Sequence, residues 1–470
     1  MNVEATGIPP HLPDVVMDGG YPSAASISAL FEELDFQRAV QVYIWATPAV
    51  GAHAVADGLA ELGLSLTTVG IFENFLDAKT VVATGNGESI YALGAIDLGE
   101  TGAVVVETPP GVLGFVMSGW QQPLEDIGPL GPDKGTGGKF VFLPPGSDEQ
   151  VPEGCFAVPS DTRLVIWLVR GFVKDGKTEP AVQAIQGMRI YPLANAASPP
   201  PMKFVNVSGK KATLIPLGDR VDGLAFFETL ARIVEREPPR EQDKQFLGLL
   251  ASLGIEQGKP FGPDGRMRDI LTRAAATGHA MTAALSYDSR YPNKLRWPGT
   301  SRWEELLLSE HVDFVTPNQV ELDGRAGLYY QAAGASKGAL LDLVGAGSKY
   351  AATFKDRDGN WLDGSRNYRL RVPPNPPVKD FWSVVVYDAE TRSMIANDQG
   401  VSSRNSYQQF AANDDGSIDL YFGPQAPAGK EDHWVQTNPG VGFFLYFRWY
   451  GPLEPYFDKT WKLDDVEPVE

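Results

Sequence analysis

The feature that most constrains the fold of this chain is a succession of short apolar runs separated by glycine and proline turn signals. The 470 residues include 50 glycines and 37 prolines, a combined share well above the usual share of roughly 12%. Turn signals of this kind, as at Gly85-Asn86-Gly87 and Pro109-Pro110-Gly111, favour many turns joining short strands. We therefore predict a mainly β protein with accessory α-helices. Its strands are expected at 67–72, 90–96, 103–108, 112–120, 139–143, 163–170, 350–354, 368–372, 381–387, 417–422 and 442–450.

Two of the predicted strands, 381–388 and 443–450, carry apolar side chains at nearly every position. Successive side chains of a strand point to opposite faces, so both faces of these strands are apolar. A strand of this kind belongs in the middle of a sandwich or beneath another domain.

Helical patterns occupy the rest of the chain. Apolar residues between 26 and 64 recur mostly at steps of three and four, and Pro48 interrupts them, which predicts two helices or one kinked helix. Similar patterns return at 221–236, 241–253 and 264–285. We divide the chain into an N-terminal arm and helices (1–64), a first β-sandwich domain (65–218), a helical connecting region (219–323) and a second β-sandwich domain (324–470).

Charge and composition exclude several classes of partner. The 40 Lys and Arg residues against 59 Asp and Glu residues leave a net charge of −19, which repels nucleic acid and anionic lipid surfaces. No apolar run approaches the roughly 18 residues of a membrane-spanning helix. The N-terminus reads as an extended arm over Met1–Ser23 without signal-peptide features. We therefore expect a soluble, cytoplasmic protein, although trimming of the sequence could have removed an export signal.

Metal and cofactor motifs are missing from the sequence. The five histidines form no HxH or HxxxH pair, and Cys155 is the single cysteine. There is no Walker loop or GxGxxG motif. The acidic run 356–364 resembles part of a calcium loop, but its Asp-Gly pairs favour a hairpin. We expect no cofactor and no metal.

The polar loop that enters the strand at Ile90 is the main candidate for chemistry. Asn86 supplies an amide, Glu88 a carboxylate and Tyr91 a phenol, which could orient a carbonyl or hydroxyl group and move its proton. The structural alternative is that Glu88 accepts hydrogen bonds from its own turn or pairs with an arginine.

Further candidates for substrate binding lie elsewhere in the chain. The glycine-rich loop 128–139 could place Lys134 against an anion, or could be only a hairpin tip. Arg448 lies within an aromatic strand and needs a partner if it is buried. Trp382 and Tyr387 could stack on sugars or other rings, although an aromatic sandwich core would have the same sequence.

Several strings together resemble a largely uncharacterised family that joins two domains of unknown function, the types numbered twelve fifty-four and twelve fourteen. The strings similar to the first type are 43–48, 86–91, 97–98 and 131–146, and those similar to the second are 362–368, 380–388, 413–417, 448–452 and 460–462. Trp45, in the first of these strings, joins the candidate substrate-binding residues. The resemblance implies two jelly-roll-like antiparallel β-sandwich domains and a homo-oligomer.

The chain departs from the family pattern at two positions. Glu88 stands where the family more commonly has aspartate, which lengthens the carboxylate side chain by one methylene. His433 precedes Trp434 where asparagine is more common, so a titratable imidazole replaces an amide. We add His433 to Glu88 and Tyr91 as candidate catalytic residues.

Three functions are compatible with these features. The first is a cofactor-independent enzyme, a hydrolase of a small ester, amide or glycoside that uses a carboxylate as acid or base. The second is a non-catalytic protein that binds a carbohydrate or an apolar small molecule. The third is a lyase or isomerase acting on a small apolar substrate. We favour the hydrolase because the polar loops concentrate hydrogen-bond donors around a carboxylate.

Overall fold

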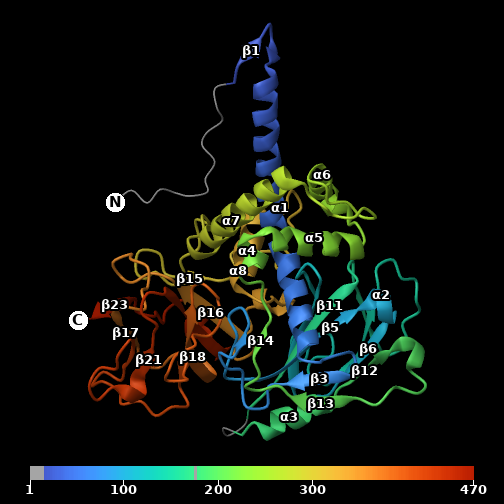
Figure 1. Ribbon diagram of the computed structural model, residues 1–470. Helices are drawn as coiled ribbons and strands as arrows, with labels where there is room; N and C mark the ends of the chain where they lie inside the picture. The colour runs from blue at the N-terminus through green and yellow to red at the C-terminus, as the bar shows by residue number, and fades with distance from the viewer. Residues whose placement is uncertain (1–14, 174–176, 470) are drawn as a thin grey trace.

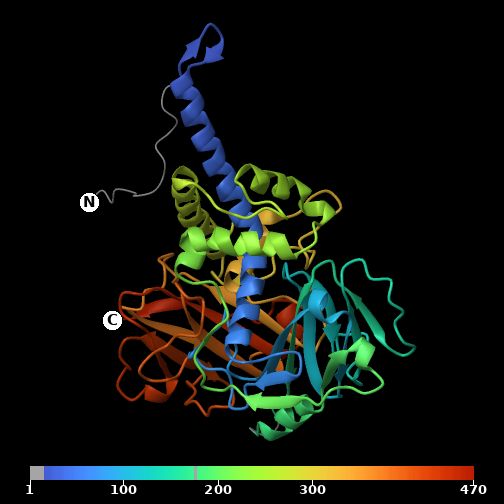
Figure 2. The same ribbon diagram turned by 45° about the vertical axis from the view of Figure 1, so that its right-hand side comes forward.

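Residues 15–173 and 177–469 are described by a computed structural model of the chain. Two β-sheet units flank a long helix, α1 (Ala24–Glu61), which enters between them from a layer of helices (Figures 1 and 2). The predicted mainly β architecture with accessory helices is confirmed.

The first unit is a sandwich of a six-stranded and a four-stranded sheet. In spatial order, the larger sheet contains β13 (Lys203–Asn206), β3 (Thr68–Ile71), β5 (Ile90–Asp97), β11 (Leu164–Gly171), β7 (Val112–Ser118) and β8 (Pro123–Ile127). The smaller sheet contains β10 (Phe156–Pro159), β9 (Gly138–Leu143), β6 (Val104–Thr108) and β12 (Arg189–Pro192). Pairing is antiparallel except where β13 joins β3 and β10 joins β9. Apolar side chains from both sheets form the core between them.

The second unit pairs a five-stranded sheet with a four-stranded sheet. The larger sheet contains β15 (Glu304–Glu305), β16 (Ser348–Thr353), β22 (Phe443–Pro452), β18 (Val378–Asp388) and β19 (Ser403–Asn405). The smaller one contains β21 (Trp434–Gln436), β20 (Ile418–Gly423), β17 (Asn367–Val372) and β23 (Val466–Val469), with β21 parallel to β20. Aromatic side chains fill much of this core.

A layer of helices surrounds the middle of α1 (Figure 1). Its members are α4 (Asp219–Asp222), α5 (Leu224–Arg236), α6 (Lys244–Ser252), α7 (Gly265–Tyr287) and α8 (Leu322–Gln331). Pro48 lies inside α1, which continues through it as one helix. Its neighbours Ala46, Ala49 and Val50 are fully buried, so packing offsets the backbone hydrogen bond that proline removes. Among the helices of the described residues, none has both the length and the apolar character needed to cross a bilayer.

The two larger sheets face each other across the end of α1. In β22, Leu445 and Phe447 enter the core of the second sandwich, whereas Phe444 and Tyr446 join a separate cluster. This second cluster also contains Ile166 of β11 and other residues of the six-stranded sheet and α1. The two apolar faces predicted for this strand thus enter two different clusters.

The N-terminal end of α1 projects away from the body of the molecule (Figures 1 and 2). A small hairpin of β1 (Met17–Asp18) and β2 (Tyr21–Pro22) lies at its tip. Residues 1–14 of the predicted extended arm lie outside the described residues.

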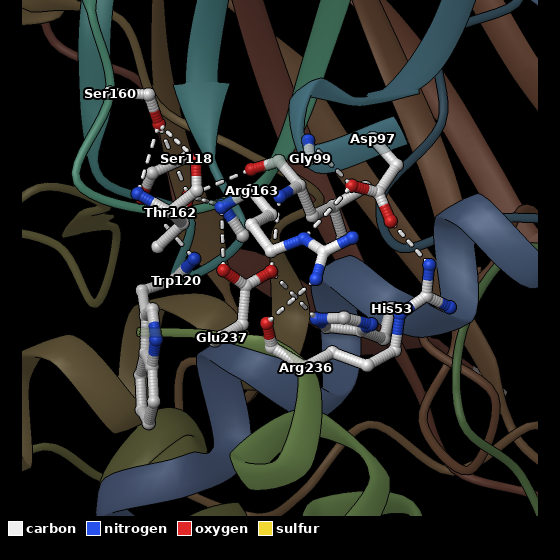
Figure 3. Close-up of polar contacts among 12 residues, drawn as sticks. His53, Asp97, Gly99, Ser118, Trp120, Ser160, Thr162, Arg163, Arg236 and Glu237 are labelled. Carbon is white, nitrogen blue, oxygen red and sulfur yellow. Dashed lines mark hydrogen bonds and ion pairs between the residues drawn. The ribbon is translucent and has the colours of Figure 1, made fainter. Parts of the chain in front are cut away.

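A buried carboxylate joins the helical layer to the first sandwich (Figure 3). The backbone N–H groups of Arg163 and Leu164, where β11 begins, donate to Glu237 at 2.6 and 3.0 Å. Glu237 directly follows α5, so these bonds fix the end of that helix against the six-stranded sheet.

Candidate functional site

A cavity of about 290 Å³ lies between the two facing sheets. Phe115, Met117 and Leu168 of the six-stranded sheet form part of its wall, and Val55 of α1 closes another side. The segment between α8 and β16 contributes further small and apolar residues. The wall is therefore mainly apolar, as in most pockets for small molecules.

Polar side chains from both sheets gather at one part of this cavity. We call them the polar cluster, which consists of Asn86, Tyr91, Arg170, Tyr350, Arg448 and, adjoining the lining residues, Tyr450.

Strand register explains how distant residues meet in the polar cluster. Tyr91 of β5 lies directly opposite Arg170 of β11. In the facing sheet, Tyr350 of β16 lies directly opposite Arg448 of β22. Residues opposite each other in an antiparallel pair place their side chains on the same face of the sheet. Each sheet therefore presents an arginine with a tyrosine opposite it to the space between the sandwiches.

The predicted polar loop is held between the sheets by its backbone. Arg448 Nη2 donates to the carbonyl oxygen of Thr84 at 2.8 Å, and Tyr387 Oη donates to that of Gly85 at 2.7 Å. Asn86 Nδ2 donates to Tyr450 Oη at 2.6 Å and to Tyr91 Oη at 3.2 Å. Because buried carbonyl groups need donors, Arg448 and Tyr387 have a clear structural role here.

Glu88 is buried beside the polar cluster but does not line the cavity. Its backbone N–H donates to Asn86 Oδ1 at 2.8 Å. Neither oxygen of its carboxyl group has a hydrogen-bond partner among the described residues. Burial raises the pKa of Glu88, and Arg448 and nearby serine hydroxyls lower it by less. The carboxyl group forms neither of the contacts expected in the structural alternative.

Of the candidate residues Asn86, Glu88, Tyr91 and Lys134, the structure brings the first three together. Lys134 is exposed on the glycine-rich loop, where its backbone N–H closes a turn onto Gly131 at 3.1 Å. That loop contributes Leu130 to the cavity wall instead.

The remaining predicted site residues lie away from the cavity. Trp45 is buried in the helical layer and donates from Nε1 to Asp243 at 3.2 Å. Trp382 belongs to the core of the second sandwich. His433 is buried with its Nε2 3.3 Å from the carbonyl oxygen of Ala411. None of these three residues, nor Lys134, lines the cavity.

Several groups in the cavity wall were not among the predicted site residues, and two of them, Arg170 and Asp126, stand on the six-stranded sheet. Arg170 is a charged residue near the end of an apolar strand. A charged residue within an apolar strand is also the signal that made Arg448 a candidate. Asp126 accepts a hydrogen bond from the backbone N–H of Gly338 at 2.6 Å, and burial raises its pKa to about 6. Nothing in the local sequence around Asp126 indicates a buried site, because the covering segment lies far along the chain.

The acidic run 356–364 forms a turn held by hydrogen bonds between its own residues. Asp356 Oδ1 accepts the backbone N–H groups of Asp358 and Asn360 at 3.0 and 2.9 Å. The run is not a hairpin between the flanking strands, because β16 and β17 lie in different sheets. Within residues 15–173 and 177–469, no group of three or more His, Cys, Asp or Glu side chains could hold a metal ion.

Comparisons with known proteins show relatives in fold and family. The crystal structure of the VPA0106 protein from Vibrio parahaemolyticus is 18% identical in sequence, with a TM-score of 0.56 over 93% of this chain and 100% of that chain. A second crystal structure, of an uncharacterized protein from Burkholderia cenocepacia, is 13% identical, with a TM-score of 0.38 over 95% of this chain and 90% of that chain. These likenesses concern the fold alone. No curated protein matches the chain.

Two family models match the chain in the predicted order. The model described as protein of unknown function DUF1254 matches residues 67–192, within the first sandwich. The model described as protein of unknown function DUF1214 matches residues 347–454, within the second. The predicted tandem of two domains of unknown function is therefore confirmed, with the DUF1254 match preceding the DUF1214 match along the chain.

Proposed function

We propose that this protein binds an apolar small molecule in the cavity between its two sandwiches. The observation that carries the proposal is the cavity of about 290 Å³, with apolar walls and one polar cluster. Its volume is close to the lower end of the roughly 300 to 1,000 Å³ found for small-molecule sites. Apolar walls around an empty space lack dispersion contacts, and a bound apolar body would supply them.

Binding of a neutral fluorescent probe, N-phenyl-1-naphthylamine, tests this proposal. The purified protein should enhance the probe's fluorescence in a saturable titration. Leu168→Trp adds bulk to a side chain that lines the cavity, and should weaken binding by about 10-fold or more.

A matched control makes the same exchange outside the cavity. Leu34→Trp changes a partly exposed leucine on the projecting part of α1 and should leave probe binding unchanged. Absence of saturable binding to the unmodified protein, or equal binding by Leu168→Trp, would show that the cavity is not the binding site.

A second candidate function is hydrolysis of a small ester, amide or glycoside without a cofactor. The observation in its favour is that Asn86 and Tyr91 line the cavity while Glu88, with its raised pKa, lies beside them in the same loop. Tyr91 would contact the substrate, and Glu88 would act as a positioning residue through the charge of Arg448.

Substitution of Glu88 tests the hydrolase proposal. Glu88→Gln keeps the shape of the side chain and removes its titration, so turnover of any accepted ester, amide or glycoside should fall and its pH profile should change. Tyr91→Phe, which removes only the phenol oxygen, should lower kcat for the same substrate. Unchanged turnover and pH profile in Glu88→Gln would remove Glu88 from this role.

We also propose that the protein is a homo-oligomer in which the projecting part of α1 packs on a second copy of the chain. This part of the molecule exposes large apolar side chains, among them Tyr21 and Phe31, which are 76% and 60% accessible. Exposed apolar patches on a folded surface commonly mark contacts with another protein.

A further inference from the structure

The polar cluster contains two guanidinium groups that form no ion pair with any carboxylate of the described residues. Arg448 is 5% accessible, and its Nη2 donates to the carbonyl oxygen of Thr84 and to Tyr387 Oη. Its Nε has no hydrogen-bond partner in the part of the chain that the structure describes. Arg170 Nη2 donates to Ser348 Oγ at 3.1 Å. All these acceptors are uncharged groups.

The nearest carboxyl group, that of Glu88, forms no hydrogen bond with Arg448 or Arg170. Burial raises the pKa of Glu88, and the charge of Arg448 lowers it by less. Arginine, by contrast, stays protonated at all pH values at which proteins are folded. Uncompensated buried charge is costly, and an anionic ligand would offset the cost.

The other charged side chains of the cavity wall, Asp126 and Lys349, each contact the segment that covers the cavity. Asp126 Oδ2 accepts the backbone N–H of Gly338 at 2.6 Å, whereas its Oδ1 has no hydrogen-bond partner among the described residues. Lys349 Nζ donates to the carbonyl oxygen of Ala339 at 2.9 Å and lies 3.3 Å from Asp342 Oδ1. Like the two arginines, Asp126 and Lys349 stand on the facing sheets, in β8 and β16, but their contacts go to the covering segment.

The two arginines differ in how they can serve a ligand. The Nη2 group of Arg448 is engaged in holding the polar loop, so this residue mainly contributes charge. Arg170 lies on the cavity wall with part of its surface accessible, next to Tyr91 and Tyr350. Guanidinium and phenol groups together are suited to the two oxygens of a carboxylate.

We infer that the cavity binds an organic carboxylate with an apolar body, whose carboxylate group lies at Arg170 and whose body packs against Phe115, Met117 and Leu168. This inference rests on the proposed binding function and names the class of its ligand. The apolar body can be an aliphatic chain or an aromatic ring, since the wall offers both aliphatic and aromatic contacts.

A comparison of charged and neutral ligands tests the inference. Displacement of the naphthylamine probe is measured at about pH 8, where carboxylic acids are ionised. Decanoate and 4-phenylbutyrate represent the aliphatic and the aromatic acid, and 1-decanol and 4-phenyl-1-butanol are their neutral counterparts. At least one acid should bind about 10-fold tighter than its alcohol.

Substitution of Arg170 locates the effect. Arg170→Met should weaken binding of the preferred acid by about 10-fold or more while the alcohol's affinity changes less than about 2-fold. Arg170→Lys keeps the charge without the forked donor geometry. Its affinity for the preferred acid should lie between those of the unmodified protein and Arg170→Met. Arg189→Met makes the same exchange at an exposed arginine of the first sandwich and should have no effect.

The possible outcomes separate this inference from the proposed function. If each alcohol binds as tightly as its acid, or if Arg170→Met keeps the preference for the acid, the inference is wrong and apolar binding stands. If no ligand displaces the probe and the probe itself does not bind, the proposed function fails as well. The comparison of acid with alcohol in the unmodified protein decides the inference even if the variants do not fold.

Discussion

At the scale of single residues, His53 shows how burial alone changes the charge of a side chain. It lies on α1 with its Nε2 3.9 Å from Glu237 Oε1 (Figure 3). Burial lowers the pKa of His53 from its ordinary value of 6.5 to about 4, and Asp57 opposes this shift only in part. At neutral pH the imidazole is therefore uncharged, and its contact with Glu237 is not an ion pair.

This depressed pKa predicts a loss of stability in acid. Above pH 6.5 His53 is neutral in both the folded and the unfolded chain, so it leaves the free energy of unfolding unchanged. As the pH falls from 6.5 towards 4, only the unfolded chain takes up the proton, and the folded state loses stability. At about pH 5 the loss should be about 2 kcal/mol.

Urea unfolding followed by tryptophan fluorescence at about pH 7.5 and about pH 5 measures this loss. His53→Gln cannot titrate and should lose about 2 kcal/mol less than the unmodified protein between these two pH values. His311→Gln replaces a histidine elsewhere in the chain and serves as the control. Equal losses in His53→Gln and the unmodified protein would contradict the prediction.

At the scale of elements, the sequence predicts the central strands well and the edge strands poorly. The run 90–96 becomes β5 and the run 163–170 becomes β11, each within two residues of its predicted bounds. These strands lie inside sheets and carry long apolar runs, so their pattern is strong. Edge strands β8 and β10 escape prediction because β8 is acidic and begins with proline, and β10 has only four residues.

Helix α8 escapes prediction for a different reason. It contains two glycines and is buried on nearly all sides, from Arg325 to Gln331. Burial on all sides removes the alternation of apolar and polar residues that reveals a surface helix. The segment after it forms part of the cavity wall, so the sequence alone does not show that the cavity is covered.

The polar cluster could be predicted in part from the sequence. Asn86 and Tyr91 belong to one loop and strand, and their proximity follows from their spacing. Arg448 stands out because it interrupts an aromatic strand. The meeting of Arg170 with Tyr450, whose ring centroid lies 5.9 Å from the guanidinium carbon, depends on how the two sandwiches pack. No local pattern encodes that packing, so this half of the site needs the structure.

At the scale of the whole molecule, the projecting part of α1 is the feature that one chain does not explain. Two ion pairs, Arg266 with Asp35 and Arg273 with Glu32, join its base to α7. Along this part of the helix Ile27, Phe31 and Leu34 are exposed, and the hairpin at the tip adds further exposed apolar side chains. Helices without tertiary packing are marginally stable in water.

The spacing of these side chains favours a helix-to-helix contact. Residues four and three apart lie on the same face of a helix, so the three form one apolar stripe. In a closed dimer the same stripe serves both copies, which buries it without any other partner. Ile27→Glu combined with Phe31→Glu should therefore convert an oligomer into a monomer, as measured by light scattering on a sizing column.

The control for this prediction places a charge on another exposed apolar residue. Met281→Glu on α7 changes a side chain that is 47% accessible and should keep the oligomer intact. The double variant should keep its helix content and its binding of the naphthylamine probe, because the cavity lies at the other end of α1. The prediction is wrong if the unmodified protein is a monomer, or if the double variant has the same oligomer mass as the unmodified protein. The stripe would then have a role other than contact between copies.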